Sequence, residues 1–167
     1  RRVLAVVPHA LRPAWESEIA KLTALSVRSL PRSRNARQTC YHEPPFFSLA
    51  TYEQASEDVL EINRHLQPEI VILDEAQRIR DWDSPVALRI KQLQSRYAFV
   101  LTSDPVVEDL EAVYALMSFV SPDVLGPLFR FNREYYRFDD NGRPAGTRNL
   151  DRLAERVRPY VLRRLRS

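Results

Sequence analysis

Short apolar runs alternate along the chain with amphipathic segments. Five runs are rich in β-branched or aromatic residues, and they cover residues 3–7, 24–30, 46–50, 70–73 and 97–101. Between them, apolar residues recur at helical spacing over residues 11–22, 52–66 and 85–93. Continuously apolar strands that alternate with helices are typical of a parallel sheet buried on both faces. The pattern therefore predicts an α/β fold with right-handed crossovers.

Helix boundaries and the end of the chain complete this prediction. Thr51 begins a capping box with Gln54, which places a helix start at the end of the third apolar run. One apolar stripe follows residues 108–120, and further helices are expected over residues 128–137 and 150–158, with a loop at 139–142 between them. We expect a first lobe over residues 1–120 and a helical extension over residues 121–167. Residues 33–45, which contain Arg34, Arg37 and two prolines, are the best candidate for a mobile loop.

Composition restricts the class of protein. A chain of 167 residues that is 44% apolar and 28% charged can bury the core of one domain. No stretch approaches the ~18 apolar residues of a membrane span, and the first apolar run meets Pro8 too early for a signal peptide. The single Cys40 excludes an internal disulfide, and no Cys or His lies at metal-ligand spacing from it. We expect an intracellular protein without structural zinc or a membrane partner, cytoplasmic and nucleoid-associated if bacterial.

The distribution of charge says more than the net value of +3. Only Lys21 and Lys91 are lysines, so almost all basic residues are arginines. An acid-free block contains Arg28, Arg32, Arg34 and Arg37, and a second arginine-rich segment follows residue 142. Basic segments on an otherwise acidic chain suggest a surface for a polyanion. A solvated helix face at a domain junction explains the same pattern, and the charges alone favour that interpretation.

Two acids, Asp74 and Glu75, follow directly on the apolar run 70–73. In an open parallel sheet, ligands bind beyond the carboxyl ends of the strands, where these acids would emerge. One acid can hold a divalent ion through its coordinated water, while the next orients and deprotonates an attacking water. Alternatively, Asp74 caps the helix that begins near Ala76, and Glu75 interacts with its positive end. The preceding strand and the following Ala76 and Gln77 favour the first interpretation.

Five segments carry a resemblance to a known family. They read V-L-A-V-V-P at 3–8 with L-R-P-A-W-E-S-E-I at 11–19, T-Y-E at 51–53, D-E-A-Q at 74–77 with R-I-R-D-W-D-S at 78–84, L-T-S-D-P at 101–105, and V-L-R-R at 161–164. In this order they resemble motifs Ia, Ib, II and III and the closing arginine pair of the first lobe of Swi/Snf-type (SNF2-family) DNA translocases, in helicase superfamily 2. The resemblance implies a RecA-like, three-layer parallel sheet with helices on both faces.

The resemblance also implies roles for individual residues. Asp74 would be the acid associated with Mg²⁺, through water and only with ATP, and Glu75 would position the hydrolytic water. Gln77 would sense the nucleotide and contact motif III. The coupling residues of motif III would be Thr102, Ser103 and Asp104. ATP and Mg²⁺ are therefore the expected cofactors of the parent protein.

Double-stranded DNA is the partner that the resemblance implies. The residues at which such proteins contact the phosphates of one strand correspond to Pro8, His9, Arg12, Thr51 and Tyr52. A translocase must hold any sequence, so it binds phosphate rather than base edges. Each position also has a structural alternative. Pro8 would end a strand, Thr51 would cap a helix, and Tyr52 and Trp15 would be core aromatics.

The chain departs from the family pattern in two respects. Motif III of the family reads L-T-G-T-P, whereas this chain has Ser103 and Asp104 in place of the Gly and second Thr. Serine loses access to positive φ, and the aspartate adds a third carboxylate near Asp74 and Glu75, so coupling between hydrolysis and movement is in question. No G-x-x-x-x-G-K-[ST] phosphate loop occurs in residues 1–167. We expect a fragment that neither binds ATP tightly nor hydrolyses it, and that works with a second RecA-like lobe.

Three functional hypotheses follow. The leading one is a fragment of an ATP-dependent double-stranded DNA translocase, which supplies the motif II acids and part of the DNA track. The alternative is a degenerate RecA-like lobe that binds nucleic acid or serves as a scaffold without ATPase activity. A receiver domain with Asp74 as phospho-acceptor fits poorly. It would require an earlier acidic pair and a late lysine, and only Lys21 and Lys91 exist.

Overall fold

In the computed structural model, which describes residues 1–81, 83–103 and 109–164, five parallel strands form one sheet. The strands are β1 (Val3–Val6), β2 (Val27–Ser29), β3 (Phe47–Ala50), β4 (Ile70–Leu73) and β5 (Tyr97–Val100). Their order across the sheet is β2-β3-β1-β4-β5, and every neighbouring pair is parallel. The predicted α/β class and all five predicted strands are confirmed, although β2 is shorter than the apolar run that predicted it.

The hydrogen-bond ladder continues beyond the carboxyl ends of the strands. The amide of Val7 donates to Ala50 O at 2.8 Å, that of Asp74 to Val6 O at 2.9 Å, and that of Leu101 to Leu73 O at 2.8 Å. Because the strands are parallel, the segments that follow them emerge at one edge of the sheet, which we call the carboxyl edge. This edge gathers segments that are far apart in sequence.

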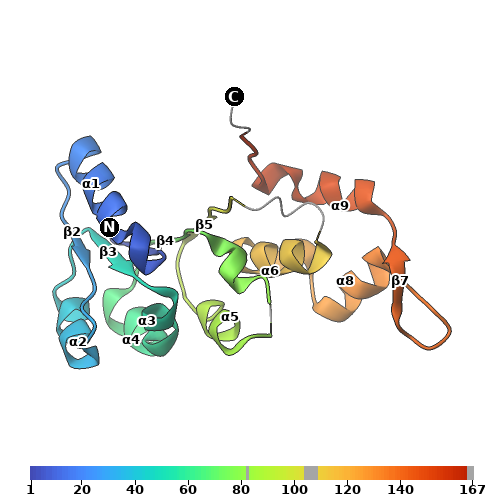
Figure 1. The fold of residues 1–167 in the computed structure, drawn as a ribbon, viewed down its shortest axis with the longest axis horizontal. Helices are drawn as coiled ribbons and strands as arrows, with labels where there is room; N and C mark the ends of the chain where they lie inside the picture. The colour runs from blue at the N-terminus through green and yellow to red at the C-terminus, as the bar shows by residue number, and fades with distance from the viewer. Residues whose placement is uncertain (82, 104–108, 165–167) are drawn as a thin grey trace. The chain divides into compact units, whose positions relative to one another are not determined.

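Helices cover both faces of the sheet, as predicted. In Figure 1, α1 (Arg12–Leu22) lies on one side of the strands, and the other side is occupied by α2 (Arg34–His42), α3 (Tyr52–Glu57), α4 (Val59–Glu61) and α5 (Pro85–Ile90). The short helices η1 (His9–Leu11) and η3 (Ala76–Ile79) lie at the carboxyl edge. The single helix expected over residues 52–66 is interrupted at Asp58 and continues as the π-helix η2 (Ile62–Leu66).

The expected mobile loop at residues 33–45 is wrong, because this segment contains α2. The helix is held by a buried ion pair between Arg37, whose side chain is 3% exposed, and Asp58, which is fully buried. Tyr41 Oη donates to Asp58 Oδ2 at 2.8 Å, and Arg37 also donates to Glu57 at 2.8 Å. The hydrogen bond from Arg37 to Asp58 raises the pKa of the guanidinium. A polar stretch thus forms an ordered helix because its cation is neutralised inside the fold.

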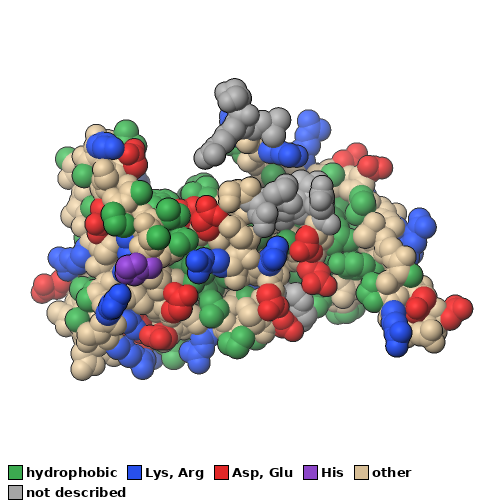
Figure 2. Space-filling model, viewed as in Figure 1, with side chains coloured by type: hydrophobic (Ala, Val, Ile, Leu, Met, Phe, Trp, Pro, Cys, Tyr) green, Lys and Arg blue, Asp and Glu red, His purple; other side chains and the backbone are tan. Residues whose placement is uncertain are grey.

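This contact also corrects the interpretation of the arginine block. Arg37 faces inward, and Arg34 donates to Glu61 at 3.1 Å, so neither belongs to a free basic surface. On the face that Figure 2 draws, acidic side chains lie among the basic ones. The block is therefore not one uniform basic face, because Arg37 is buried whereas Arg28, Arg32 and Arg34 are exposed. A polyanion surface at the exposed arginines stays a prediction.

The chain divides into two compact units, Arg1–Leu116 and Met117–Ser167, and α6 (Leu110–Val120) runs across the division. The elements that follow are α7 (Pro122–Leu125), α8 (Leu128–Tyr135), β6 (Tyr136–Phe138), β7 (Pro144–Thr147), α9 (Leu150–Val157) and η5 (Arg158–Tyr160). The antiparallel pair β6 and β7 replaces the end of the helix expected to reach residue 137. Its turn closes with the amide of Gly142, at φ 76°, donating to Asp139 O at 3.0 Å. The domain boundary expected at residue 120 stays a prediction.

None of the helices within the described ranges combines the length and the hydropathy that crossing a membrane requires.

We expect Arg37→Ala to destabilise the packing of α2 by about 3–5 kcal/mol, because the substitution leaves the buried Asp58 carboxylate without its main counter-charge. Hydrogen exchange of the α2 amides in the full-length protein measures this change. Arg28→Ala is the matched control, since Arg28 belongs to the same block but is exposed, and its guanidinium donates to Cys40 Sγ at 3.9 Å. Equal protection of α2 in both variants would contradict the structural role of Arg37.

Candidate active site

Asp74 begins the segment that follows β4, and hydrogen bonds fix both its side chain and its main chain. Its Oδ2 accepts a hydrogen bond from Trp15 Nε1 at 2.8 Å, and its Oδ1 accepts from the amide of Glu75 at 3.0 Å. Its carbonyl oxygen accepts from Tyr52 Oη at 2.8 Å. Because Trp15 lies on α1 and Tyr52 opens α3, helices on both sides of the sheet set the orientation of this acid.

Glu75 has a left-handed backbone, with φ 51° and ψ 49°. A non-glycine residue in this region costs conformational energy, and such residues often occur at functional sites. Its Oε2 accepts hydrogen bonds from Gln77 Nε2 at 2.5 Å and from Ser103 Oγ at 2.8 Å. These two bonds, first that of Gln77, hold the pKa of the Glu75 carboxyl below its usual value. A carboxylate of low pKa remains ionised and is better suited to orienting a water molecule than to retaining its proton.

Gln77 joins the end of β4 to the end of β5. Its amide nitrogen donates to Glu75, and its Oε1 accepts from Thr102 Oγ1 at 2.9 Å. The backbone makes a parallel connection, since the amide of Ala76 donates to Leu101 O at 2.9 Å. The structure thus brings together Glu75, Gln77, Thr102 and Ser103 of the predicted site. Asp104, also predicted to take part in coupling, lies outside the described residues.

Thr51 and Tyr52 have inward-facing roles. The amide of Gln54 donates to Thr51 Oγ1 at 3.2 Å, and Gln54 Oε1 accepts from the amide of Thr51 at 3.1 Å, so the predicted capping box is present. Tyr52 is 2% exposed and its hydroxyl is bonded to Asp74. The helix-cap and core interpretations of these two residues are therefore correct. A contact with DNA at either residue stays a prediction that rests on the resemblance alone.

Arg12 is also directed inward, whereas the residues just before it reach the surface. Its guanidinium is buried, donates to Leu30 O at 3.1 Å, and bonds Gln54 Oε1. Pro8 is half-buried and His9 is exposed, and both follow β1 at the carboxyl edge. Of the predicted DNA contacts, these two have the accessibility that the role requires.

The carboxylate oxygens of Asp74 suit a metal ion that binds together with a substrate. Across the described ranges, no group of three or more His, Cys, Asp or Glu side chains could hold a metal. Mg²⁺ usually keeps several waters and binds through one or two carboxylates together with substrate phosphates. A single oriented carboxylate at the end of a strand meets that requirement. Asp74 therefore fits the carboxylate requirement of an Mg²⁺ ion that binds together with phosphates.

Sequence reasoning missed Trp15 as a partner of the site. Its ring packs against the buried cluster that contains Ala5, Val7, Ile19 and Leu49, as expected of a core aromatic. Its indole N–H, however, reaches Asp74, which is 59 residues further along the chain. The available signal was the polar end of the tryptophan, because an indole N–H that is removed from water usually finds an acceptor.

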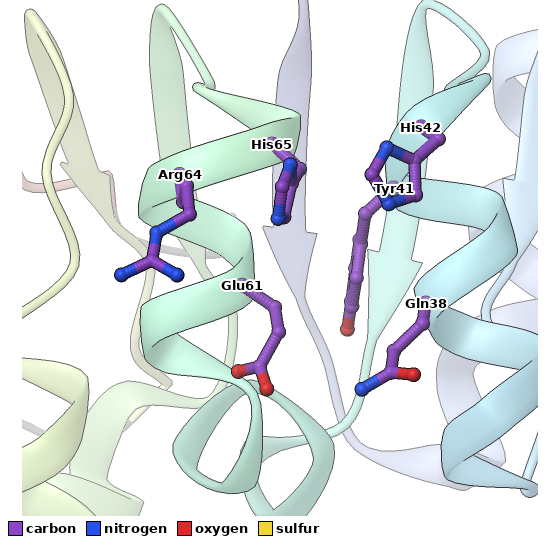
Figure 3. A pocket seen from close by; sticks show the side chains of 6 residues that line it. All are labelled: Gln38, Tyr41, His42, Glu61, Arg64 and His65. Atoms are coloured by element: carbon purple, nitrogen blue, oxygen red, sulfur yellow. The ribbon is translucent and has the colours of Figure 1, made fainter.

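A separate hollow of 290 Å³ lies between α2 and η2 (Figure 3). Its lining residues are Gln38, Tyr41, His42, Glu61, Arg64 and His65. The rings of His42 and His65 face one another with centroids 4.3 Å apart, and Arg64 extends away from α2. The helices that line the hollow lead into the amino ends of β3 and β4, so the hollow lies away from the carboxyl edge. It takes no part in the site around Asp74.

Comparisons with known proteins find similar sequences and a similar fold over nearly the whole chain. A family model described as the SNF2-related domain matches residues 1–167. The chromatin structure-remodeling complex protein SYD of Arabidopsis thaliana is 27% identical over 98% of this chain. The Zorya protein ZorD of Escherichia coli O139:H28 is 30% identical over 71% of it. The Sulfolobus solfataricus SWI2/SNF2 ATPase core in complex with dsDNA covers 98% of this chain with a TM-score of 0.78 and 22% identity, so it has the same fold.

The chain spans only a small part of these proteins. It covers 5% of SYD, 11% of ZorD and 33% of the Sulfolobus ATPase core. Activities that belong to those whole proteins are therefore matters of proposal for this chain.

We expect Gln77→Ala to raise the pKa of the Glu75 carboxyl, because the variant removes the stronger of the two hydrogen bonds to the ionised form. Ser103→Ala should produce a smaller rise in the same direction. Carbon-detected NMR titration of the Glu75 carboxyl measures both changes. Ser95→Ala is the control, since its hydroxyl donates to Tyr97 O at the opposite end of β5. A Glu75 pKa that is the same in all three variants would contradict the network.

Proposed function

The chain belongs to the SNF2-related family, and we propose that it forms part of the ATP-hydrolysing core of a protein that translocates along double-stranded DNA. The observation that carries this proposal is the arrangement of Asp74 and Glu75 at the carboxyl edge. One acid is oriented by two helices, and the other is held by Gln77 and Ser103. The family match over the whole chain supports the same activity. The remainder of the parent protein would supply the phosphate-binding residues, because residues 1–167 contain no G-x-x-x-x-G-K-[ST] motif.

The two acids have different tasks in this proposal. ATP with Mg²⁺ supplies the transferable phosphoryl group and the positive charge that stabilises its transfer. Asp74 would hold the ion through its coordinated water. Glu75 would accept a hydrogen bond from the water that attacks the phosphoryl group and would orient it. The ionised state of Glu75, which its lowered pKa favours, keeps that acceptor available at neutral pH.

Gln77 and Ser103 would connect this chemistry to movement. Both donate to the same oxygen of Glu75, and Thr102 donates to Gln77 from the end of β5. A displacement of the segment after β5 therefore changes the position of the carboxylate that aligns the water. This is a direct physical path between motif III and hydrolysis.

The DNA track would begin with Pro8 and His9. These residues are accessible at the same edge of the sheet as the acids, and they precede α1. The similarity to an ATPase core solved in complex with dsDNA supports DNA as the partner. Contacts with phosphates carry no sequence information, which suits a protein that must move along any sequence.

We expect Glu75→Gln in the full-length protein to lower DNA-stimulated ATP hydrolysis by about 100-fold or more, because an amide aligns and activates water poorly. Nucleotide binding, measured by fluorescence titration with a labelled ATP analogue, should be retained. Glu18→Gln is the matched control, because Glu18 is an exposed residue of α1 whose side chain pairs with Lys21 at 2.7 Å. Unimpaired turnover in Glu75→Gln would contradict the proposal and favour a scaffolding role without ATPase activity.

We expect His9→Ala in the full-length protein to weaken binding to duplex DNA severalfold, independently of sequence, since a contact with phosphate is lost. Fluorescence anisotropy at two salt concentrations measures the change. Arg96→Ala is a stringent control, because it removes a full positive charge. The Arg96 guanidinium stacks on the Tyr97 ring at the opposite end of the sheet. If Arg96→Ala weakens binding as much as His9→Ala does, the placement of the track is wrong.

A further inference from the structure

We propose that Trp15 and Tyr52 are positioning residues that make the orientation of Asp74 depend on the seating of α1 and α3, the two helices that begin beside the proposed DNA track. This inference rests on the proposed function and adds a second connection to it. The connection through Gln77 and Ser103 reaches Glu75 from β5. The one proposed here reaches Asp74 from the opposite side of the site.

The two hydrogen bonds hold different parts of Asp74. Trp15 Nε1 donates to the carboxylate oxygen Oδ2, and Tyr52 Oη donates to the main-chain oxygen, each at 2.8 Å. One bond therefore sets the direction of the side chain, and the other sets the position of the backbone that carries it. Loss of either bond leaves Asp74 with fewer constraints, although the carboxylate itself is intact.

Neither donor can adjust its position without moving its helix. The ring of Trp15 packs beside Ile19 against the apolar cluster of β1 and β3, so its N–H has a fixed direction. Tyr52 is 2% exposed and is the first residue of α3, so its ring is fixed by the start of that helix. A shift of α1 or α3 is therefore passed to Asp74 rather than absorbed by side-chain rotation.

The starts of α1 and α3 are also connected to each other. Arg12, the first residue of α1, bonds Gln54 Oε1, the same atom that accepts the amide hydrogen bond of Thr51 in the capping box of α3. Gln54 Nε2 in turn donates to Pro31 O at 2.9 Å, which attaches the segment that follows β2. Contact at the exposed residues before α1 would therefore shift both helix starts together, and with them both donors to Asp74.

The decisive variant is Trp15→Phe in the full-length protein, which removes the N–H and keeps an aromatic ring in the cluster. We expect kcat for DNA-stimulated ATP hydrolysis to fall by about 10-fold or more, because partners that orient a metal-associated acid have effects of this size. The concentration of Mg²⁺ at half-maximal rate should rise, and hydrolysis without DNA should fall less than hydrolysis with DNA. Loss of packing alone would not shift the Mg²⁺ dependence.

Tyr52→Phe provides a second measurement and decides the matter if Trp15→Phe does not fold. It should change kcat and the Mg²⁺ dependence in the same direction. The double variant should lose less than the product of the two single effects, because both residues act through Asp74. Tyr97→Phe, at a half-exposed tyrosine of β5, is the matched control and should leave both quantities unchanged.

The outcomes separate this inference from the proposed function. If Glu75→Gln abolishes hydrolysis while Trp15→Phe and Tyr52→Phe leave kcat, the Mg²⁺ dependence and DNA stimulation unchanged, the proposed function stands and this inference is wrong. Equal losses with and without DNA would show that the two residues orient Asp74 but transmit nothing from the track, which also overturns it. Turnover retained in Glu75→Gln would end both proposals.

Discussion

The parallel direction of the five strands is the constraint on which the candidate site depends. It places the carboxyl ends of β1, β3, β4 and β5 at one edge, and the amide hydrogen bonds of Val7, Asp74 and Leu101 extend the ladder beyond the strands. Residues far apart in sequence meet there because the backbone brings them to the same edge. Side chains then only have to complete the contacts. An antiparallel sheet of the same five segments would distribute these residues over two edges.

Much of this arrangement could be predicted from the sequence, because its signals are local. Apolar runs predicted the strands, and Thr51 with Gln54 predicted the start of α3. The position of Asp74 directly after a strand predicted where the candidate site lies. The helix α2 could not be predicted, since a polar segment that contains Arg37 becomes ordered only through Asp58, 21 residues further on. The β6–β7 pair was missed because its aromatic first strand continues the pattern of the preceding helix. Such features depend on tertiary partners that a pattern along the chain does not contain.

Arginine content was a poor guide to function for the same reason. Arg12 and Arg37 are both buried, and each joins two helices by bonding oxygen atoms of other segments. A guanidinium suits this use because its planar fork reaches several acceptors at once. A count of arginines in a block therefore does not distinguish the residues that stabilise the fold from the residues that face solvent. Only the structure separates them.

Ser103 stands where the resembled family has a glycine, and its contact changes the meaning of that departure. A glycine has no side chain to offer Glu75, whereas the Ser103 hydroxyl donates to the same oxygen that Gln77 bonds. The carboxylate that would align the water is thus held from its own segment and from the segment after β5. A shift of the segment after β5 therefore acts on Glu75 by two routes, directly through Ser103 and indirectly through Thr102 and Gln77. Coupling in this chain would then depend on two contacts with that segment, where a glycine in place of Ser103 would leave only the indirect one.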